Sequence, residues 1–406
     1  MAGHGDFREC LLLFSGGLDT SCLVKWLTSE YRCEVSTLVV DVGQREDFAG
    51  LEKKAYALGA GTHYYVDARE KLVADYCLPA IRANARVGRN GHPLSASLTR
   101  PLIVSEAIAV AESAGIDVIA HGATGRANDS LRMDNTLLTL RPHFKILAPV
   151  RERAMSRDEE LRYAVQNEID VPVTTERLHS IDENLWAREI EAGDLESPSV
   201  TPQAALFGAA EATGSAGGST VVRIRFASGI PVAVDGKRMK PLDLVTLLND
   251  LGSPYGIGRF DCMEDRGVGV KVRELHEAPA ATILMTVFSD LQELVLTREE
   301  IRVARTLEME WVDLVLNGHW HNTLKQTMDQ FFATLATRVE GEVTLRIQQG
   351  QCAVVARESP YSLDLTNLVS KGLLDELNMR ATAPFIEVSG LQRRMAFQLN
   401  QGVRHA

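Results

Sequence analysis

The sequence has few of the patterns that mark zinc sites, disulfide frameworks or membrane segments. Its six cysteines are Cys10, Cys22, Cys33, Cys77, Cys262 and Cys352. None forms a CxxC pair, so their spacing predicts neither a metal site nor a thioredoxin-type motif. No uncharged apolar run reaches the roughly 18 residues that a membrane span needs, and Met1–Arg8 is polar. We therefore expect free thiols, no membrane partner and a cytoplasmic location.

Basic charge is also scarce. The chain has 43 Lys and Arg against 54 Asp and Glu, and a formal net charge of −11. Nucleic-acid binders need a basic patch because phosphate contacts supply much of their affinity. The two small arginine pairs, Arg151 with Arg153 and Arg393 with Arg394, are interpreted as solvated surface arginines. The composition thus predicts no nucleic-acid partner.

Two common nucleotide-binding signatures are missing. There is no GxxxxGK[ST] and no GxGxxG after a strand, and Gly256-Ile257-Gly258 lacks the third glycine. Instead, the apolar run Cys10–Phe14, typical of a strand buried on both faces, leads into a loop and then a helix. The loop contains Ser15, Gly16, Gly17, Asp19, Thr20 and Ser21.

Such a loop suits a phosphate. The two glycines allow positive φ and a close backbone approach, and the N–H groups at a helix N-terminus attract anions. The hydroxyls of Ser15, Thr20 and Ser21 add donors. Asp19 repels phosphate by charge, so we expect it to orient the loop or to help hold Mg²⁺.

Strand and helix patterns alternate as far as about residue 167, which indicates parallel βαβ units. Ligands bind beyond the carboxyl ends of such strands. Ser15–Ser21, Asp41–Gln44 and Gly122–Asp129 should therefore meet at one edge of the sheet. From about Leu178 short strands and helices mix, with a hairpin predicted over Val221–Phe226 and Pro231–Val234, and the last stretch is partly amphipathic. The fold class is α/β, followed by an α+β domain and a C-terminal helical arm.

At the loop the chain resembles the PP-loop ATP pyrophosphatases, and further segments narrow the resemblance to the argininosuccinate synthase family. These segments occur in the family's order, at Val40–Gln44, Arg100–Leu102, His121–Asp129, Ser180–Trp186 and Leu195–Pro198. The resemblance runs from about Cys10 to about Pro384. It implies a PP-loop ATP-binding domain over residues 1–177, a synthetase domain over 178–364 and an oligomerisation arm over 365–406.

The resemblance also implies the reaction and its ligands. The family is a ligase that joins aspartate to citrulline through an acceptor adenylate, releases AMP and pyrophosphate, uses ATP and Mg²⁺, and is typically a homotetramer. The loop residues, Asp41 and Gly122 would contact ATP, while Thr124, Asn128 and Asp129 would bind aspartate. Ser97, Arg132, Ser180 and Glu264 match acceptor-binding positions. Asp19, Asn128, Asp129 and Arg132 are the candidate catalytic residues.

The departures from the family pattern gather on the acceptor side. His92 and His276 stand where the family has tyrosines, Glu189 where it has a serine, and Ala96 within a usual G-T-S motif. Glutamate adds a charge, and histidine can gain one near neutral pH. Two alternatives to citrulline ligation therefore stay open. One is a paralogue that uses another ureido, amide or lactam acceptor, and the other is an ATP-binding member without catalysis.

Overall fold

The computed structural model describes residues 7–88, 90–125, 127–153, 157–170, 179–208, 218–372 and 379–404. The chain divides into two compact units, Met1–Tyr361 and Ser362–Ala406. The predicted boundary between residues 177 and 178 lies outside the described residues. So does most of Leu206–Thr220, a stretch rich in Gly, Ala and Ser that predicts a loop before the hairpin. The division at 177/178 and 364/365 stays a prediction.

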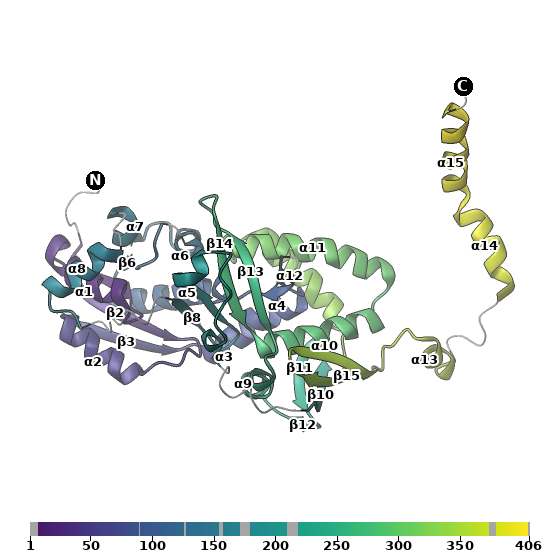
Figure 1. The fold of residues 1–406 in the computed structure, drawn as a ribbon, viewed down its shortest axis with the longest axis horizontal. Helices are drawn as coiled ribbons and strands as arrows, with labels where there is room; N and C mark the ends of the chain where they lie inside the picture. Colours follow the sequence, from purple (N-terminus) through teal and green to yellow (C-terminus); the bar gives the residue numbers. More distant parts are fainter. Residues whose placement is uncertain are drawn as a thin grey trace. The chain divides into compact units, whose positions relative to one another are not determined.

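The amino-terminal part contains a five-stranded sheet of order β3-β2-β1-β6-β7, in which every pairing is parallel. This confirms the predicted parallel α/β sheet (Figure 1). Its strands are β1 (Glu9–Leu13), β2 (Glu34–Asp41), β3 (Thr62–Asp67), β6 (Val118–Ala120) and β7 (Lys145–Leu147).

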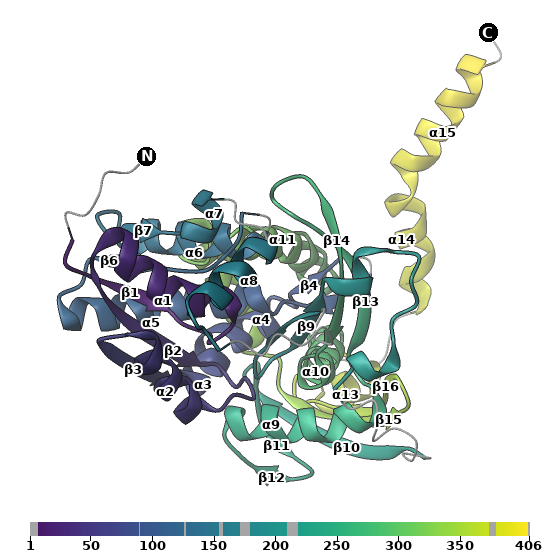
Figure 2. The ribbon, with the colours of Figure 1, turned by 60° about the vertical axis from the view of Figure 1, so that its left-hand side comes forward.

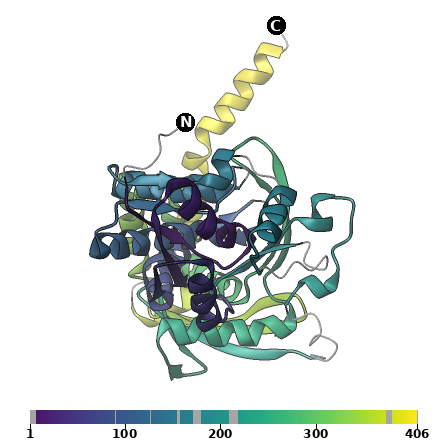
Figure 3. The same cartoon turned by 90° about the vertical axis from the view of Figure 1, so that its left-hand side faces the viewer.

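Helices cover both faces of this sheet (Figure 3). Side chains of a strand alternate between faces, so Leu11 and Leu13 join one apolar cluster while Cys10, Leu12 and Phe14 join another. That double burial explains the unbroken apolar run of β1. The second cluster includes side chains of α1 (Leu18–Tyr31), α2 (Phe48–Leu58) and α8 (Arg157–Gln166). The first includes those of α5 (Ala96–Ala114), the π-helical segment Leu72–Cys77 and α4 (Leu78–Arg82).

The sequence pattern predicts a helix over Pro101–Ala114, but helix α5 begins five residues earlier, at Ala96. Ala96, Ser97, Leu98 and Thr99 are all buried, so tertiary packing extends the helix beyond what the proline indicates. The remaining elements of this part are α3 (Arg69–Lys71), β4 (Arg86–Val87), β5 (His92–Pro93), α6 (Asn128–Leu140) and α7 (Pro149–Arg153).

Two antiparallel sheets follow, which confirms the change to an α+β pattern. A four-stranded sheet of order β13-β14-β9-β8 holds β8 (Ser180–Glu183), β9 (Arg188–Glu191), β13 (Arg259–Asp265) and β14 (Lys271–Glu277). A five-stranded sheet of order β12-β11-β10-β15-β16 holds β10 (Thr220–Ala227), β11 (Ile230–Val234), β12 (Lys237–Arg238), β15 (Gly341–Gln348) and β16 (Gln351–Glu358). The antiparallel pairing of β10 and β11 confirms the predicted hairpin.

Four long helices accompany these sheets. Helix α9 packs on β11, and α10 packs on α9, β15 and β16 (Figure 2). The helices are α9 (Pro241–Gly252), α10 (Pro279–Val295), α11 (Arg298–Leu316) and α12 (Thr323–Ala336), with short 3-10 turns at Gly193–Glu196, Ala204–Leu206 and Ser253–Tyr255. Across the described residues, no helix is both long and apolar enough to cross a membrane.

The carboxy-terminal unit is helical. It contains α13 (Leu365–Ser370), a 3-10 turn at Met379–Ala381, α14 (Thr382–Ser389) and α15 (Leu391–Arg404). Large apolar side chains are exposed on its last two helices, among them Phe385 at 70%, Val388 at 73% and Leu399 at 67%. The helical nature of the predicted arm is thereby confirmed.

Candidate active site

The predicted phosphate loop lies at the carboxyl edge of the parallel sheet. It follows β1, the central strand, whose neighbours are β2 and β6. Gly122, just after β6, lies so close to the loop that a Cβ there would be 3.2 Å from Cγ2 of Thr20 and 3.5 Å from Cβ of Asp19. The sheet therefore brings Gly122 against the loop, as the strand order predicts.

The loop holds a conformation that its residue types allow. Gly16 has φ +72°, and its carbonyl oxygen accepts from Lys54 Nζ at 2.6 Å and from Ser21 Oγ at 3.2 Å. The hydroxyls of Ser15 and Thr20 are 3.2 Å apart. Gly17 is the N-cap of α1, and no side chain caps the helix. The first N–H groups of α1 are thus available to an anion.

Asp41, the last residue of β2, is held by its surroundings. Its carboxylate accepts from the Gly43 N–H at 2.8 Å and from the Tyr65 hydroxyl at 2.9 Å, and Arg69 Nε lies 3.4 Å away. The carboxylate is buried and oriented by these donors. It lies at the same edge of the sheet as the loop, because β1 and β2 are parallel neighbours.

The segment after β6 is fixed by a histidine and an arginine. His121 Nδ1 accepts from the Ala123 N–H at 3.2 Å, so Nε2 carries the proton that it donates to Asp134 at 2.9 Å. Arg151 donates to Asp134 and to Ser130, both at 2.6 Å. The interpretation of Arg151 as a solvated arginine is wrong, because its side chain is two-thirds buried in this network.

Arg132 and Asp129 form the centre of a second polar cluster at the start of α6. Asp129 accepts from Arg100 Nε at 2.9 Å, from Arg100 Nη2 at 2.7 Å and from Arg132 Nη1 at 3.2 Å. Arg132 also donates to Glu264 of β13 at 3.3 Å. Burial opposes ionisation of Asp129, but the two guanidinium groups hold its pKa below the ordinary value.

Asn128 closes this cluster against the β13–β14 hairpin, which stands beside α6 in Figure 1. Its amide donates to the Asp265 carbonyl at 3.2 Å and accepts from the Gly267 N–H at 2.8 Å. The structure thus brings together three predicted residues, Asn128, Asp129 and Arg132, with a fourth, Glu264. Thr124 lies half-buried in the segment between β6 and α6.

One face of the four-stranded sheet carries acidic side chains toward this cluster. Alternate residues of a strand share a face, and the register pairs Glu189 with Asp182 and with His276. Arg266 forms ion pairs with Glu191, with Glu274 and, at 2.8 Å, with Glu264. The polar residues of this face are Ser180, Asp182, Glu189, Glu191, Cys262, Glu264, Glu274 and His276.

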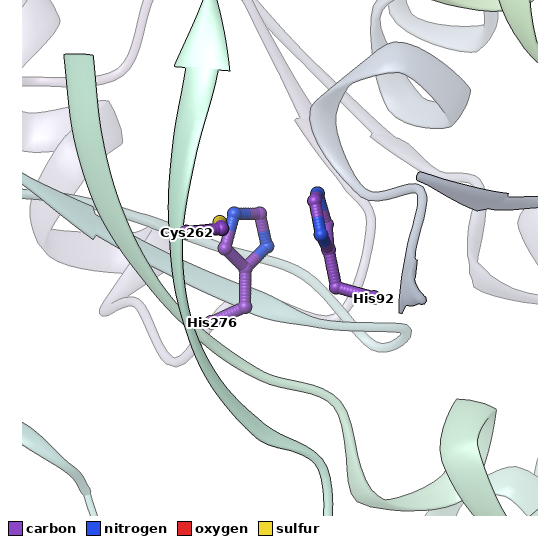
Figure 4. Close-up of side chains that lie close together, drawn as sticks. All are labelled: His92, Cys262 and His276. Carbon is purple, nitrogen blue, oxygen red and sulfur yellow. The ribbon is translucent and has the colours of Figure 1, made fainter. Parts of the chain in front are cut away.

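The departures on the predicted acceptor side lie together. The rings of His92 and His276 have centroids 4.6 Å apart (Figure 4). Glu189 Oε1 lies 3.8 Å from His276 Nδ1 and accepts from the Ala96 N–H at 3.4 Å. Burial and the neighbouring His276 lower the pKa of His92 to about 3, and burial raises the pKa of Glu189 to about 8. Burial on this side of the site therefore favours the neutral forms of both groups.

Two further predicted acceptor residues, Ser97 and Ser180, lie near this group of side chains. Ser97 is buried in the first turn of α5, one residue after Ala96, whose N–H reaches Glu189. Ser180 is exposed at the start of β8, opposite Glu191 in the register.

Sequence reasoning missed several residues of the site. Arg100 bridges Asp129 and Asp182, and Arg266 gathers three glutamates, yet neither received a role. A usable signal existed in the alternation of Glu189 with Glu191, Cys262 with Glu264 and Glu274 with His276. Such alternation predicts one polar face on each strand. The pairing of those strands was not readable from the chain.

The fold and site define a nucleotide-binding domain of the HUP class followed by a domain with antiparallel sheets. A family model described as the arginosuccinate synthase N-terminal HUP domain matches residues 9–170, and one described as the arginosuccinate synthase C-terminal domain matches residues 179–396. The chain belongs to the argininosuccinate synthase family.

Related proteins align with almost the full length of this chain. The argininosuccinate synthases of Pyrococcus furiosus and Methanocaldococcus jannaschii are each 39% identical, over 97% and 95% of this chain and 95% and 97% of their own lengths. That of Dehalococcoides mccartyi is 38% identical over 97% of both chains. These relatives confirm the resemblance and do not favour either alternative function. A solved structure titled as a predicted subunit of tRNA methyltransferase from M. jannaschii has 16% identity, covers 39% of this chain and 76% of its own, and has a TM-score of 0.28, too low to bear on the fold.

Proposed function

We propose that this protein is an ATP-dependent ligase that condenses L-aspartate with citrulline and releases AMP and pyrophosphate. The observation that carries the proposal is the continuity of residues 121–132. This segment begins against the phosphate loop at Gly122 and ends in the Asp129–Arg132 cluster. A nucleotide on the loop and an amino acid at the cluster would therefore be adjacent, as adenylation followed by displacement requires.

The reaction has two balanced steps. The ureido oxygen of citrulline attacks the α-phosphorus of ATP, a P–O bond forms, and the bond to pyrophosphate breaks. The aspartate amine then attacks the ureido carbon, a C–N bond forms, the C–O bond to AMP breaks, and the nitrogen loses its proton. Both steps develop charge on oxygen, which the loop N–H groups and the hydroxyls of Ser15, Thr20 and Ser21 would stabilise.

The charged cluster would position substrates rather than move protons. Because Arg100 and Arg132 keep Asp129 ionised, this carboxylate is a weak base, so we assign it to orienting the ammonium of aspartate. Asn128 would hydrogen-bond the same substrate from α6. Arg132, with Ser97, Ser180 and Glu264 around the acceptor, would pair with the acceptor's carboxylate.

Mg²⁺ would accompany the nucleotide. This ion binds through one or two carboxylates together with phosphate oxygens and water. Asp19 lies in the first turn of α1, beside the loop and against Gly122. Its carboxylate fits a Mg²⁺ ligand at this edge, and the ion would neutralise phosphate charge there.

The exposed apolar residues of α14 and α15 support an assembly through the carboxy-terminal unit. Phe385, Ile386, Phe397 and Leu399 are each more than half exposed, and patches of this kind mark interaction surfaces. We propose a homotetramer of this chain. Six free cysteines, four of them buried, fit a reducing cytoplasm.

Pyrophosphate release by the purified protein with ATP, Mg²⁺ and aspartate, with and without citrulline, tests the proposal. Release that depends on both citrulline and aspartate, with argininosuccinate as the product, is expected. A protein that binds ATP but releases no more pyrophosphate with citrulline than without it contradicts the proposal. Without aspartate, pyrophosphate release should stop after at most one equivalent per active site, which corresponds to the adenylate formed in the first step.

A further inference from the structure

A group of metal-ligating side chains lies beside the proposed acceptor site. His92, Cys262 and His276 each offer a ligand atom, and these atoms all lie within 4.8 Å of one another. Figure 4 shows the imidazole of His276 between the sulfur of Cys262 and the ring of His92. The three residues come from β5, β13 and β14, so the group forms only in the folded chain.

The histidines are poorly satisfied as packed side chains. Within the described part of the chain, Nδ1 of His92 and Nδ1 of His276 are buried without a hydrogen-bond partner. The two residues are only 6% and 3% exposed. Buried polar atoms are normally hydrogen-bonded. Two orphaned nitrogens beside a thiol are better explained as a donor set for a ligand.

A fourth ligand and a supporting partner are in place. Glu189 Oε1 lies 3.8 Å from the orphaned Nδ1 of His276. The other ring nitrogen of His276, Nε2, lies 3.1 Å from Glu274 Oε2. With Nε2–H donating to Glu274, Nδ1 keeps its lone pair for a metal. Metal-bound histidines commonly have such a carboxylate partner.

The surrounding composition also suits a cation, because carboxyl groups outnumber guanidinium groups there. The polar network holds six carboxyl groups, of Asp129, Asp182, Glu189, Glu191, Glu264 and Glu274, and three guanidinium groups, of Arg100, Arg132 and Arg266. Two histidines, one thiolate and one carboxylate form a borderline-soft set that suits Zn²⁺ in tetrahedral geometry. Ligand atoms around such a zinc lie about 3.3–3.8 Å apart, from bond lengths of about 2.0–2.3 Å, so side-chain rotation would close the group.

We propose that His92, Cys262 and His276, with Glu189 as the fourth ligand, bind one Zn²⁺ per chain. The ion ties the β4–β5 hairpin to the four-stranded sheet on the acceptor side. This metal site goes beyond the proposed ligase reaction, because no step of that reaction uses the ion. Because Glu189 also reaches the Ala96 N–H at the start of α5, metal loading would alter the acceptor side without touching the phosphate loop.

Binding is tested on the full chain without substrates, so the result is independent of ligase activity. Protein stripped with a chelator and kept reduced is titrated with Zn²⁺ by calorimetry, and separately with Co²⁺ by absorption spectroscopy. We expect one Zn²⁺ per chain, and for Co²⁺ the intense visible bands of a tetrahedral site with a thiolate charge-transfer band. Cys262→Ser should remove the charge-transfer band and weaken Zn²⁺ binding at least about tenfold.

A matched control separates this site from adventitious thiol binding. Cys352, on β16 of the other antiparallel sheet, is also a partly buried free cysteine, and Cys352→Ser should leave stoichiometry and spectrum unchanged. His92→Phe, which keeps the bulk of a ring, should weaken binding as Cys262→Ser does. Circular dichroism of each variant checks that it folds. Equal Zn²⁺ binding by the parent and by the folded Cys262→Ser and His92→Phe variants would overturn the proposal, and so would Co²⁺ binding without a thiolate band.

Discussion

Arg132 Nη2, on helix α6 beside the parallel sheet, lies 3.3 Å from Oε1 of Glu264 on strand β13 of the four-stranded antiparallel sheet. The same guanidinium donates to Asp129 at 3.2 Å and to the Leu316 carbonyl at 3.1 Å. One side chain therefore joins the aspartate and acceptor sides of the proposed site, and it is nearly fully buried.

Arg132→Lys keeps the charge but cannot span these partners, because an ammonium is a compact point donor. Loss of a charge-assisted hydrogen bond costs about 1.5–3 kcal/mol, so we expect kcat/KM for citrulline to fall about 10- to 100-fold. Arg305→Lys is the control, since Arg305 forms an exposed pair with Glu293 and should change activity less than about twofold. Equal effects of the two substitutions on kcat/KM would show that Arg132 does not contribute to citrulline recognition.

Asp129→Asn tests the orienting role. Asparagine preserves shape but leaves Arg100 and Arg132 without their shared anion. We expect the KM for aspartate to rise at least about tenfold, consistent with a lost charge-assisted contact, while ATP affinity stays within about twofold. Steady-state kinetics with each substrate varied in turn would reveal this split. A loss confined to ATP affinity would contradict the assignment.

Gly16→Ala probes the loop. Gly16 has φ +72°, and an added Cβ would overlap Cδ2 of Leu51. Gly236→Ala is the matched control, because Gly236 has φ +80° but nothing within 4 Å of an added Cβ. Both substitutions should lower the free energy of unfolding by about 1–2 kcal/mol, because alanine disfavours the left-handed conformation. Only Gly16→Ala should also weaken ATP binding, by at least about tenfold, measured by calorimetry. Unchanged ATP affinity would argue against this loop as the phosphate site.

Glu308, which lies outside the proposed site, should make the stability of the protein depend on pH. Burial raises its pKa from 4.5 to about 7, despite Asn84, Arg305 and Arg86 nearby. Between these values the folded state holds a proton that the unfolded state has lost, so the contribution of Glu308 to stability falls as pH rises through this window and stays low above pH 7. Glu308→Gln does not titrate. Its stability relative to the parent, from urea unfolding, should increase from pH 4.5 to 7 and then level off. A constant difference would show that the pKa is not raised.

Much of the fold follows from local pattern. The run Cys10–Phe14 predicted a strand buried on both faces, and Leu11 and Leu12 indeed face different clusters. The rule that ligand segments follow the carboxyl ends of parallel strands predicted Gly122 at the edge that holds the loop, and Gly122 indeed lies against Thr20. The helix boundary at Ala96 could not be predicted, because burial of that turn against other elements outweighs the local signal of Pro101.

The sequence by itself determined the family, the phosphate loop and the parallel sheet, because short motifs and strand alternation are local properties of the chain. It also located the departures at His92, Glu189 and His276. Only the tertiary structure decided that these three residues meet one another and Cys262. Glu189, for example, follows His92 by more than 90 positions in the sequence. Spacing motifs such as CxxC reveal only metal ligands that are close together in the sequence. Strand register and the packing of β5 against the four-stranded sheet place ligands from distant segments together, and no local pattern records that placement.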